Sequence, residues 1–358
     1  MCLFAPGLGS LLGIKGEIVE RRALRKWPPI KKKSLVDQKY YRNLGLYFKD
    51  NLPFRKQLVQ ADSWVDYYIF SDSATPIILP GVDNWLFFKR TIEHCSNKNE
   101  ILQKLNSVKL FADAVLESGR EFRLIVAPNK THLYYDRLSN NGKRLAKSAQ
   151  EERNTVRSAL DRNLIPGFVD LWTPFEKTAT NTGKLLFPPL DRHWNSLASL
   201  VLSQELINSL QPGLWDVSAV KPPVAGKGIG ELTALMNLQV EQPVEVWTVK
   251  RAGVKVEKKE LLLGAHPENP SYKIVSSSDD GLFYPGKTVV LGDSFIGMSV
   301  DSFCSYMEEV HLIRWPVIKT AGDIIREANT IIIESVEDRF LEDKLLNRLS
   351  ELQEILKQ

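Results

Sequence analysis

The stretch VVLGDSFIGMS, from Val289 to Ser299, passes from an apolar β-branched run through Gly-Asp-Ser into residues with helical spacing. This pattern predicts a buried strand that ends at Leu291, then a turn and a helix. In a parallel sheet, the loops at the carboxyl ends of the strands form the binding crevice. Ser294 would then lie at the mouth of this crevice, with its backbone N–H near a helix N-terminus, where negative charge is favoured. This is a suitable position for a nucleophile.

Similar runs recur along the chain and alternate with amphipathic stretches. Five runs have the character of buried parallel strands: Glu121–Pro128, Gly167–Trp172, Lys287–Ser294, Glu309–Arg314 and Asn329–Val336. Four stretches have the periodicity of covering helices: Ile101–Ser118, Ala146–Asp161, Asn195–Leu210 and Arg339–Lys357. Strands that alternate with helices predict an α/β protein, a three-layer α/β/α sandwich around a central parallel sheet.

Two parts of the chain stand outside this alternation. Residues 40–70 show helical spacing interrupted at Pro53, which predicts two helices leading into the domain. Residues 213–286 are rich in glycine and proline, and we expect an insertion with a small β element, including a hairpin that turns near Arg251–Gly253. We therefore divide the chain into an N-terminal stretch and linker, residues 1–45, and one α/β domain, residues 46–358.

The charge is unevenly distributed. The whole chain carries +4, but residues 1–33 hold eight Lys or Arg against two Glu, a balance of +6 that leaves −2 for the rest. A slightly acidic body argues against nucleic acid as the main ligand, because phosphate binding needs a clustered basic face. The basic segment is typical of a membrane-proximal segment or of a plain solvated linker.

The first fourteen residues, MCLFAPGLGSLLGI, are apolar. They are shorter than the roughly 20 residues of a spanning helix and lack a basic n-region and an A-x-A cleavage site. We interpret them as the possible remnant of a membrane anchor or signal.

The cysteines give no sign of a metal site. Cys2, Cys95 and Cys304 are far apart, with no C-x-x-C and no Cys/His ligand spacing, so neither a zinc site nor a disulfide framework is indicated.

The histidine that best suits a general base lies in PPLDRHWNSLASL, Pro188–Leu200. His193 follows Asp191 at i+2 in a loop before a helix whose N-cap is Asn195 or Ser196. The Asp191 carboxylate can then hold the imidazole while the other ring nitrogen faces Ser294. The other four histidines lack such a setting: His94, His132, His266 and His311.

Each of these motifs has a simpler structural explanation. Gly-Asp-Ser is common in turns, and Asp191 could serve only as a turn or capping residue. When both motifs lie at the edge of one crevice, they indicate a catalytic site much more specifically than either motif alone.

Their order, D-x-H first and a strand ending in G-D-S-F later, resembles the SGNH-hydrolase-like domain of the alginate O-acetyltransferase family, of the AlgJ and AlgX type. Ordinary SGNH esterases have the serine near the N-terminus and the acid–histidine pair near the C-terminus. Further segments resemble the family's motifs in order from residue 16 to about residue 345: GEIVERRALRKWPP, DNLPFRKQL, GVDNWLFFKR, IVAPNKTHLYYDRL, GIGELTALMNL and IIIESVEDRFL. Glu231 stands where the family often has aspartate.

The resemblance implies that Ser294 is the acyl-accepting nucleophile, His193 the base and Asp191 its orienting partner, with no metal or organic cofactor. It implies an acetyltransferase that modifies an exported polysaccharide, alginate-like or another exopolysaccharide. It also implies an acetyl donor supplied through a membrane-bound O-acyltransferase partner, and a place in the periplasm or cell envelope with possible membrane association through the N-terminus.

Five further residues are candidates for oxyanion or substrate contacts. Asn129 and Lys130 follow a strand end and could point into the crevice, although a loop lysine is often just solvated. Arg314 and Trp315 also follow a strand end, where they could bind a sugar ring or pack. Trp194 could shield the triad or wedge the helix start.

Two other functions remain open at this level. An esterase or deacetylase would use the same triad, with water in place of the sugar hydroxyl. A non-catalytic glycan-binding or assembly module would use the scaffold alone, but Asp191, His193 and Ser294 together argue against it.

Overall fold

A computed structural model describes residues 25–30, 34–51, 53–73, 75–93, 98–162, 164–264, 269–279 and 281–357. The chain divides into two compact units, Met1–Pro76 with Glu231–Val240 and Ile77–Gly230 with Glu241–Gln358. The predicted division at residue 45 stays a prediction. The apolar N-terminal stretch and most of the basic linker lie outside the described residues, as do His94 and His266. None of the described helices is both long and apolar enough to cross a membrane.

The first unit contains the two predicted helices. They are α2 (Gln38–Asp50) and α3 (Arg55–Tyr68), so the interruption falls at Pro53 as expected. Asp37 caps α2, because its carboxylate accepts the Lys39 N–H at 2.8 Å. A short helix, α10 (Glu231–Leu235), comes from the distant second segment of this unit.

The second unit is built on a seven-stranded sheet with the order β4-β3-β11-β9-β10-β8-β7. The strands are β3 (Glu121–Ala127), β4 (Phe168–Val169), β7 (Lys255–Leu261), β8 (Ser271–Ser277), β9 (Tyr284–Gly292), β10 (Met307–Arg314) and β11 (Thr330–Val336). Neighbours from β4 to β10 are parallel. All five predicted parallel strands are therefore confirmed, although β4 is only two residues long.

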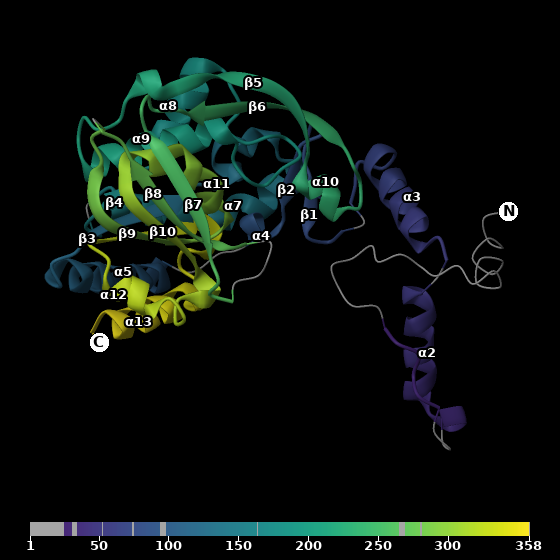
Figure 1. The fold of residues 1–358 in the computed structure, drawn as a ribbon. Coiled ribbons are helices and arrows are strands. Elements are labelled where there is room, and N and C mark those ends of the chain that lie inside the picture. The colour runs from purple at the N-terminus through teal and green to yellow at the C-terminus, as the bar shows by residue number, and fades with distance from the viewer. Residues whose placement is uncertain are drawn as a thin grey trace. The chain divides into compact units, whose positions relative to one another are not determined.

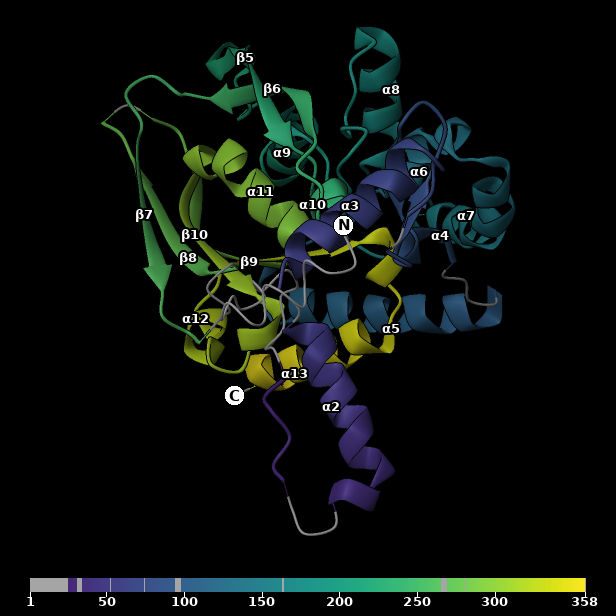
Figure 2. The ribbon, with the colours of Figure 1, turned by 90° about the vertical axis from the view of Figure 1, so that its right-hand side faces the viewer.

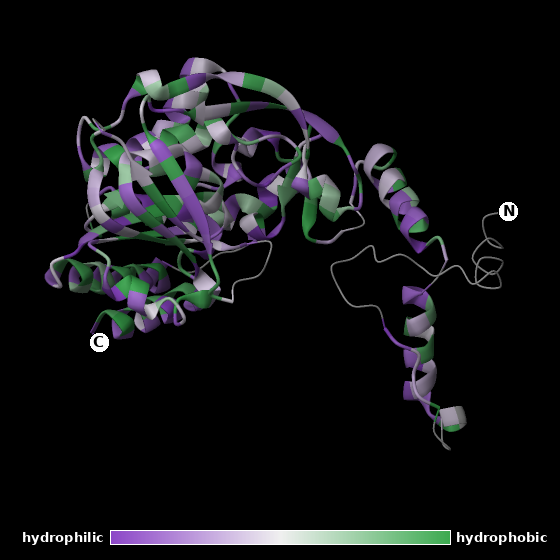
Figure 3. Cartoon of the chain, viewed as in Figure 1, coloured by the Kyte–Doolittle hydropathy of each residue, from purple (hydrophilic) through white to green (hydrophobic). Residues whose placement is uncertain are grey.

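Helices cover both faces of this sheet, which confirms the three-layer α/β/α sandwich. The principal helices are α5 (Lys98–Glu117), α7 (Asn140–Leu160), α8 (Trp172–Thr182), α9 (Ser196–Leu210), α11 (Ser294–Phe303), α12 (Gly322–Arg326) and α13 (Asp343–Lys357). In Figures 1 and 2, α5, α12 and α13 lie on one side of the sheet, and α9 and α11 lie on the other. Both α5 and α13 mix hydrophobic and hydrophilic residues, as amphipathic covering helices do (Figure 3).

The strands are apolar on both faces, so the unit has two apolar cores. Alternating residues of β9 and β11 enter different clusters: Val290 and Ile332 pack in the one with α9 and α11, and Val289 and Ile331 in the one with α5 and α13. This is the pattern expected of a parallel sheet buried on both sides.

The predicted insertion differs from expectation. The turn at Arg251–Gly253 exists, but the strands that flank it do not pair as a hairpin. The preceding strand, β6 (Glu241–Val249), pairs with β5 (Val220–Ile229) in a separate two-stranded sheet, whereas β7 pairs with β8. Arg251 anchors the turn, because its guanidinium donates to the carbonyls of Ser305 and Leu282.

The central sheet is also not wholly parallel, because β8 pairs antiparallel with the outer edge of β10. An unpaired edge would leave backbone N–H and C=O groups without hydrogen-bond partners. β8 supplies these partners to β10, and β7 in turn pairs with β8. Part of the predicted insertion thus completes the main sheet.

Candidate active site

Ser294 lies where β9 ends and α11 begins, as the sequence predicted. Gly292 is the last residue of the strand, and Asp293 is the N-cap of the helix, with its carboxylate accepting the Phe295 N–H at 2.9 Å. Ser294 is therefore the first residue of α11, at the carboxyl edge of the sheet.

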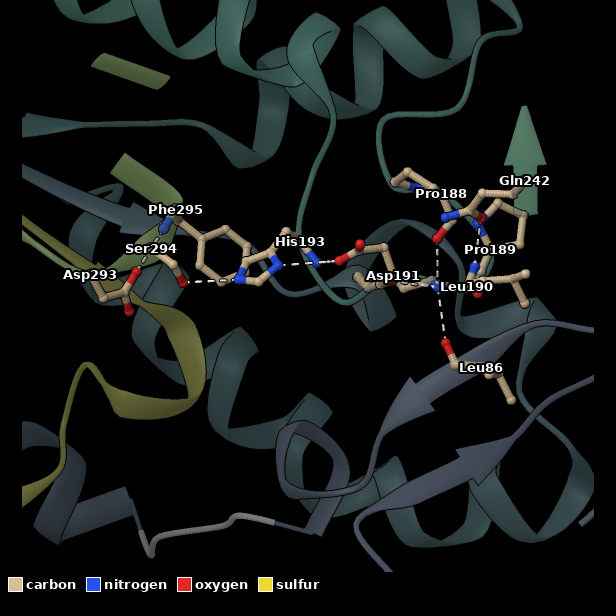
Figure 4. A network of polar contacts seen from close by, with 11 residues as sticks. Leu86, Pro188, Pro189, Leu190, Asp191, His193, Gln242, Asp293, Ser294 and Phe295 are labelled. Carbon is tan, nitrogen blue, oxygen red and sulfur yellow. Dashed lines mark hydrogen bonds and ion pairs between the residues drawn. The ribbon is translucent and has the colours of Figure 1, made fainter. Parts of the chain in front are cut away.

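His193 and Asp191 come from the loop that precedes α9, whose N-cap is Asn195. His193 Nε2 lies 2.9 Å from Ser294 Oγ, and His193 Nδ1 lies 3.2 Å from Asp191 Oδ1. Figure 4 shows the three side chains in a row, with the imidazole between hydroxyl and carboxylate. His193 is 9% exposed. Two segments distant in sequence thus form one serine–histidine–aspartate arrangement.

Asp191 also forms a turn. Its Oδ1 accepts the backbone N–H of His193 at 2.9 Å. The residues do not form an extended strand, so the i and i+2 side chains meet through this turn rather than through strand alternation. The turn considered for Asp191 and its contact with the His193 ring thus occur together.

Lys130 holds the loop that carries Asp191. Its ammonium donates to the carbonyls of Leu86, Pro188, Pro189 and Asp191 over 2.7–2.9 Å. Burial lowers the pKa of Lys130 well below its usual value, and the Asp191 carboxylate acts in the opposite direction. A neutral amine would offer only two N–H groups to these acceptors, so the charged form satisfies them better.

The expected oxyanion role of Lys130 is therefore corrected to a positioning one, since its N–H groups are directed at backbone carbonyls. It is also not a solvated loop lysine, because it is 5% exposed.

The Arg314 side chain likewise contacts backbone carbonyls, one of them next to Ser294, and these contacts take up its guanidinium. Its guanidinium donates to the Asp293 carbonyl through Nη1 and to the Pro270 carbonyl through Nε at 3.2 Å. Gly297 makes room for it, because a Cβ at that glycine would lie 2.7 Å from Arg314 Cζ. The expectation of direct sugar contact is thus corrected.

Trp315 is 6% exposed and belongs to the apolar cluster with α5 and α13. The Arg348 guanidinium carbon lies 5.7 Å from its ring centroid. Of the two roles considered for Trp315, packing in the core fits these contacts, and stacking on a sugar does not.

Trp194 is 1% exposed and packs under the histidine loop. Its Nε1 donates to Ser299 Oγ at 3.1 Å, and its ring meets Phe295 edge-on at 4.9 Å. Of the two alternatives for Trp194, shielding the triad or packing against the start of the helix, the second fits this environment.

Asn129 reaches the cleft in which Ser294 lies. This small open cleft is lined by Asn129, Ser294, Arg192 and neighbouring residues. The backbone N–H of Asn129 is taken by Glu337 at 2.9 Å, which leaves its side-chain amide as the group that could serve an oxyanion. Arg192 lies over the Phe88 ring at 5.2 Å and lines the same cleft.

Sequence reasoning missed two buried carboxyls that support this cleft. Glu337 forms an ion pair with Arg153, with both side chains below 10% exposed. Glu334, fully buried on β11, accepts the Asp293 N–H at 3.0 Å. A charged residue inside the apolar run IIIESV was the signal that could have identified Glu334.

Comparisons with known proteins agree with the fold. Residues 78–295 match the family model described as SGNH hydrolase-like domain, acetyltransferase AlgX. No curated protein matches the sequence. Among solved structures, Bacillus cereus PatB1 is similar over 75% of this chain and 98% of its own, with 16% identity and a TM-score of 0.54.

Two further structures are similar. A DHHW family protein from Eubacterium siraeum has a TM-score of 0.50 and 13% identity, covering 77% of this chain and 98% of its own. The O-acetyltransferase domain of Pseudomonas putida AlgJ has a TM-score of 0.43 and 15% identity, with coverages of 77% and 99%.

Proposed function

The chain belongs to the family of SGNH-hydrolase-like domains of the acetyltransferase AlgX type, and on this premise we propose that it is a serine-dependent O-acetyltransferase acting on an exported polysaccharide. The observation that carries the proposal is the 2.9 Å contact between Ser294 Oγ and His193 Nε2, with Asp191 on the other ring nitrogen. A serine hydroxyl needs such a base to become a nucleophile at neutral pH.

In the first half-reaction, Ser294 Oγ attacks the acetyl carbonyl of the donor as His193 Nε2 takes its proton. The donor's leaving group departs with that proton, and an acetyl ester on Ser294 remains. Asp191 holds the imidazole in the tautomer with Nδ1 protonated and stabilises the imidazolium.

In the second half-reaction, a sugar hydroxyl attacks the acetyl-enzyme. His193 removes its proton and returns it to Ser294 Oγ as the new ester leaves. The backbone N–H of Ser294, at the N-terminus of α11, and the side chain of Asn129 are the donors we assign to the oxyanion.

We place the acceptor among exported polysaccharides, alginate-like or other, and the protein in the periplasm or cell envelope. The acetyl donor would be supplied through a membrane-bound O-acyltransferase partner. These assignments follow from the resemblance of the sequence motifs to the alginate O-acetyltransferase family.

The test incubates the purified full chain with p-nitrophenyl acetate, with and without a polysaccharide acceptor. Ser294→Ala should lower acetate release by about 10³-fold, since it removes the nucleophile. Ser302→Ala, on the same helix about two turns away, is the matched control and should keep full activity. Acetate release that does not depend on Ser294 would refute the mechanism, and release that never passes to an acceptor would identify an esterase.

A further inference from the structure

A buried carboxyl that the proposed mechanism does not use lies directly behind the nucleophile. Glu334 is on β11, next to β9 in the sheet, and is 0% exposed. By strand alternation it shares a face with Ile332 and Val336, on the side of α9 and α11. A charged residue seldom occupies such a position without a partner.

Its partner is the turn that presents Ser294. Glu334 Oε2 accepts the Asp293 N–H at 3.0 Å. The approach is close, because a Cβ at Gly292 would lie 2.6 Å from this oxygen and 3.1 Å from Glu334 Cβ. Glycine at 292 therefore lets the carboxyl reach the backbone of the next residue.

In the part of the chain that the structure describes, the charged and titratable groups around Glu334 come from three elements. Asp293 belongs to the β9–α11 turn, Arg314 to β10, and Tyr272, which interacts with Arg314, to β8. Burial, and then the Asp293 carboxylate, raise the pKa of Glu334 well above its usual value. An ionised Glu334 would repel the N-cap carboxylate of the helix that begins with Ser294.

We propose that Glu334 is a positioning residue, which in its neutral form holds the Asp293–Ser294 turn from β11 and so sets the serine for attack. The inference rests on the proposed function for its kinetic consequences. It follows that the neutral amide of glutamine should replace Glu334 well, because it keeps an acceptor for the Asp293 N–H and adds no charge. Leucine, of similar size, should not.

The experiment compares wild type, Glu334→Gln and Glu334→Leu from pH 5 to 9 on the full chain. At neutral pH, Glu334→Gln should keep kcat for p-nitrophenyl acetate within about threefold of wild type. Glu334→Leu should lower kcat by tenfold or more with KM little changed. At high pH, kcat of the wild type should fall as Glu334 ionises, whereas kcat of Glu334→Gln should not. Glu309→Gln, on β10 with β9 between it and β11, is paired with Lys273; it is the matched control and should leave kcat unchanged.

A second readout avoids acetyl chemistry. The rate at which phenylmethylsulfonyl fluoride labels Ser294, followed by intact mass, should fall at least tenfold in Glu334→Leu and stay near wild type in Glu334→Gln. Labelling that follows this order in a protein that transfers no acetyl group would refute the proposed function and keep this inference. Equal labelling of all three would overturn it.

A third readout applies even if the Leu variant does not fold. An unfolded glutamate ionises above about pH 4.3, whereas folded Glu334 keeps its proton to higher pH, so wild-type stability should fall as pH rises through that interval. The melting temperature of Glu334→Gln minus that of wild type, both measured by circular dichroism, should therefore increase from pH 4 to pH 8. A difference independent of pH would contradict a neutral Glu334.

Discussion

A single carboxylate oxygen, Asp191 Oδ1, contacts His193 twice, accepting its backbone N–H at 2.9 Å and lying 3.2 Å from Nδ1 of its ring. The turn and the orientation of the base therefore depend on the same atom. A variant that keeps the turn and removes the charge separates the two roles.

Asp191→Asn should do this. The amide oxygen can still accept the His193 N–H, so the melting temperature should change little. The kcat for p-nitrophenyl acetate should fall by about 10²- to 10⁴-fold, because the imidazolium loses its carboxylate. Asp191→Ala should lose both activity and stability, and an Asn variant with wild-type kcat would show that Asp191 serves only the turn.

Lys130→Met tests the support of the histidine loop. The substitution removes the donor of one buried and three part-buried hydrogen bonds to carbonyls. A buried carbonyl left unsatisfied costs about 1–3 kcal/mol, so urea unfolding should show a loss of roughly 3 kcal/mol. The matched control is Lys319→Met, an exposed lysine, which should change stability by less than about 0.5 kcal/mol. Equal effects would indicate that the carbonyl contacts contribute nothing.

Gly297→Ala tests the packing behind the serine. The added Cβ would meet the Arg314 guanidinium, which is held by the Asp293 and Pro270 carbonyls and has little room to move. We expect a stability loss of about 1–3 kcal/mol and a clear fall in kcat as the turn shifts.

The control for this change is Gly45→Ala in α2, where a Cβ would meet nothing within 4 Å. It should be neutral or stabilising by up to about 1 kcal/mol, since alanine favours the helix. A Gly297→Ala variant that behaved in the same way would mean that Arg314 relaxes freely.

Trp194→Phe distinguishes packing from substrate contact. Phenylalanine keeps the apolar ring but removes the donor to Ser299, so thermal or urea unfolding should show a loss of about 1–3 kcal/mol. KM for a polysaccharide acceptor should stay unchanged, because the ring is 1% exposed. An increase in KM without loss of stability would assign Trp194 to the substrate.

Much of the fold could be predicted because it depends on local patterns. Uninterrupted β-branched runs such as Asn329–Val336 predict strands buried on both faces, and the intervening periodic stretches predict the covering helices. The position of Ser294 followed from one general rule, that loops at the carboxyl ends of parallel strands form the crevice. His193 was selected by the aspartate two residues before it.

The partner of each strand in residues 213–286 could not be predicted this way. A turn at Gly253 is compatible with a hairpin, but β5 competes for β6, and β8 joins both β7 and the outer edge of β10. Strand pairing depends on which backbone edges remain unsatisfied once the rest of the sheet has formed.

The sequence by itself thus determined the α/β class, the order of the five parallel strands and their main covering helices, and the three residues placed in the site. Only the tertiary structure decided what the neighbouring polar residues do. Lys130 follows a strand, Arg314 ends one and Glu334 lies within one near the crevice, yet all three side chains support loops through hydrogen bonds to the backbone. Their direction depends on buried carbonyls and N–H groups supplied by distant segments, because a buried polar group must find a hydrogen-bond partner wherever the fold provides one.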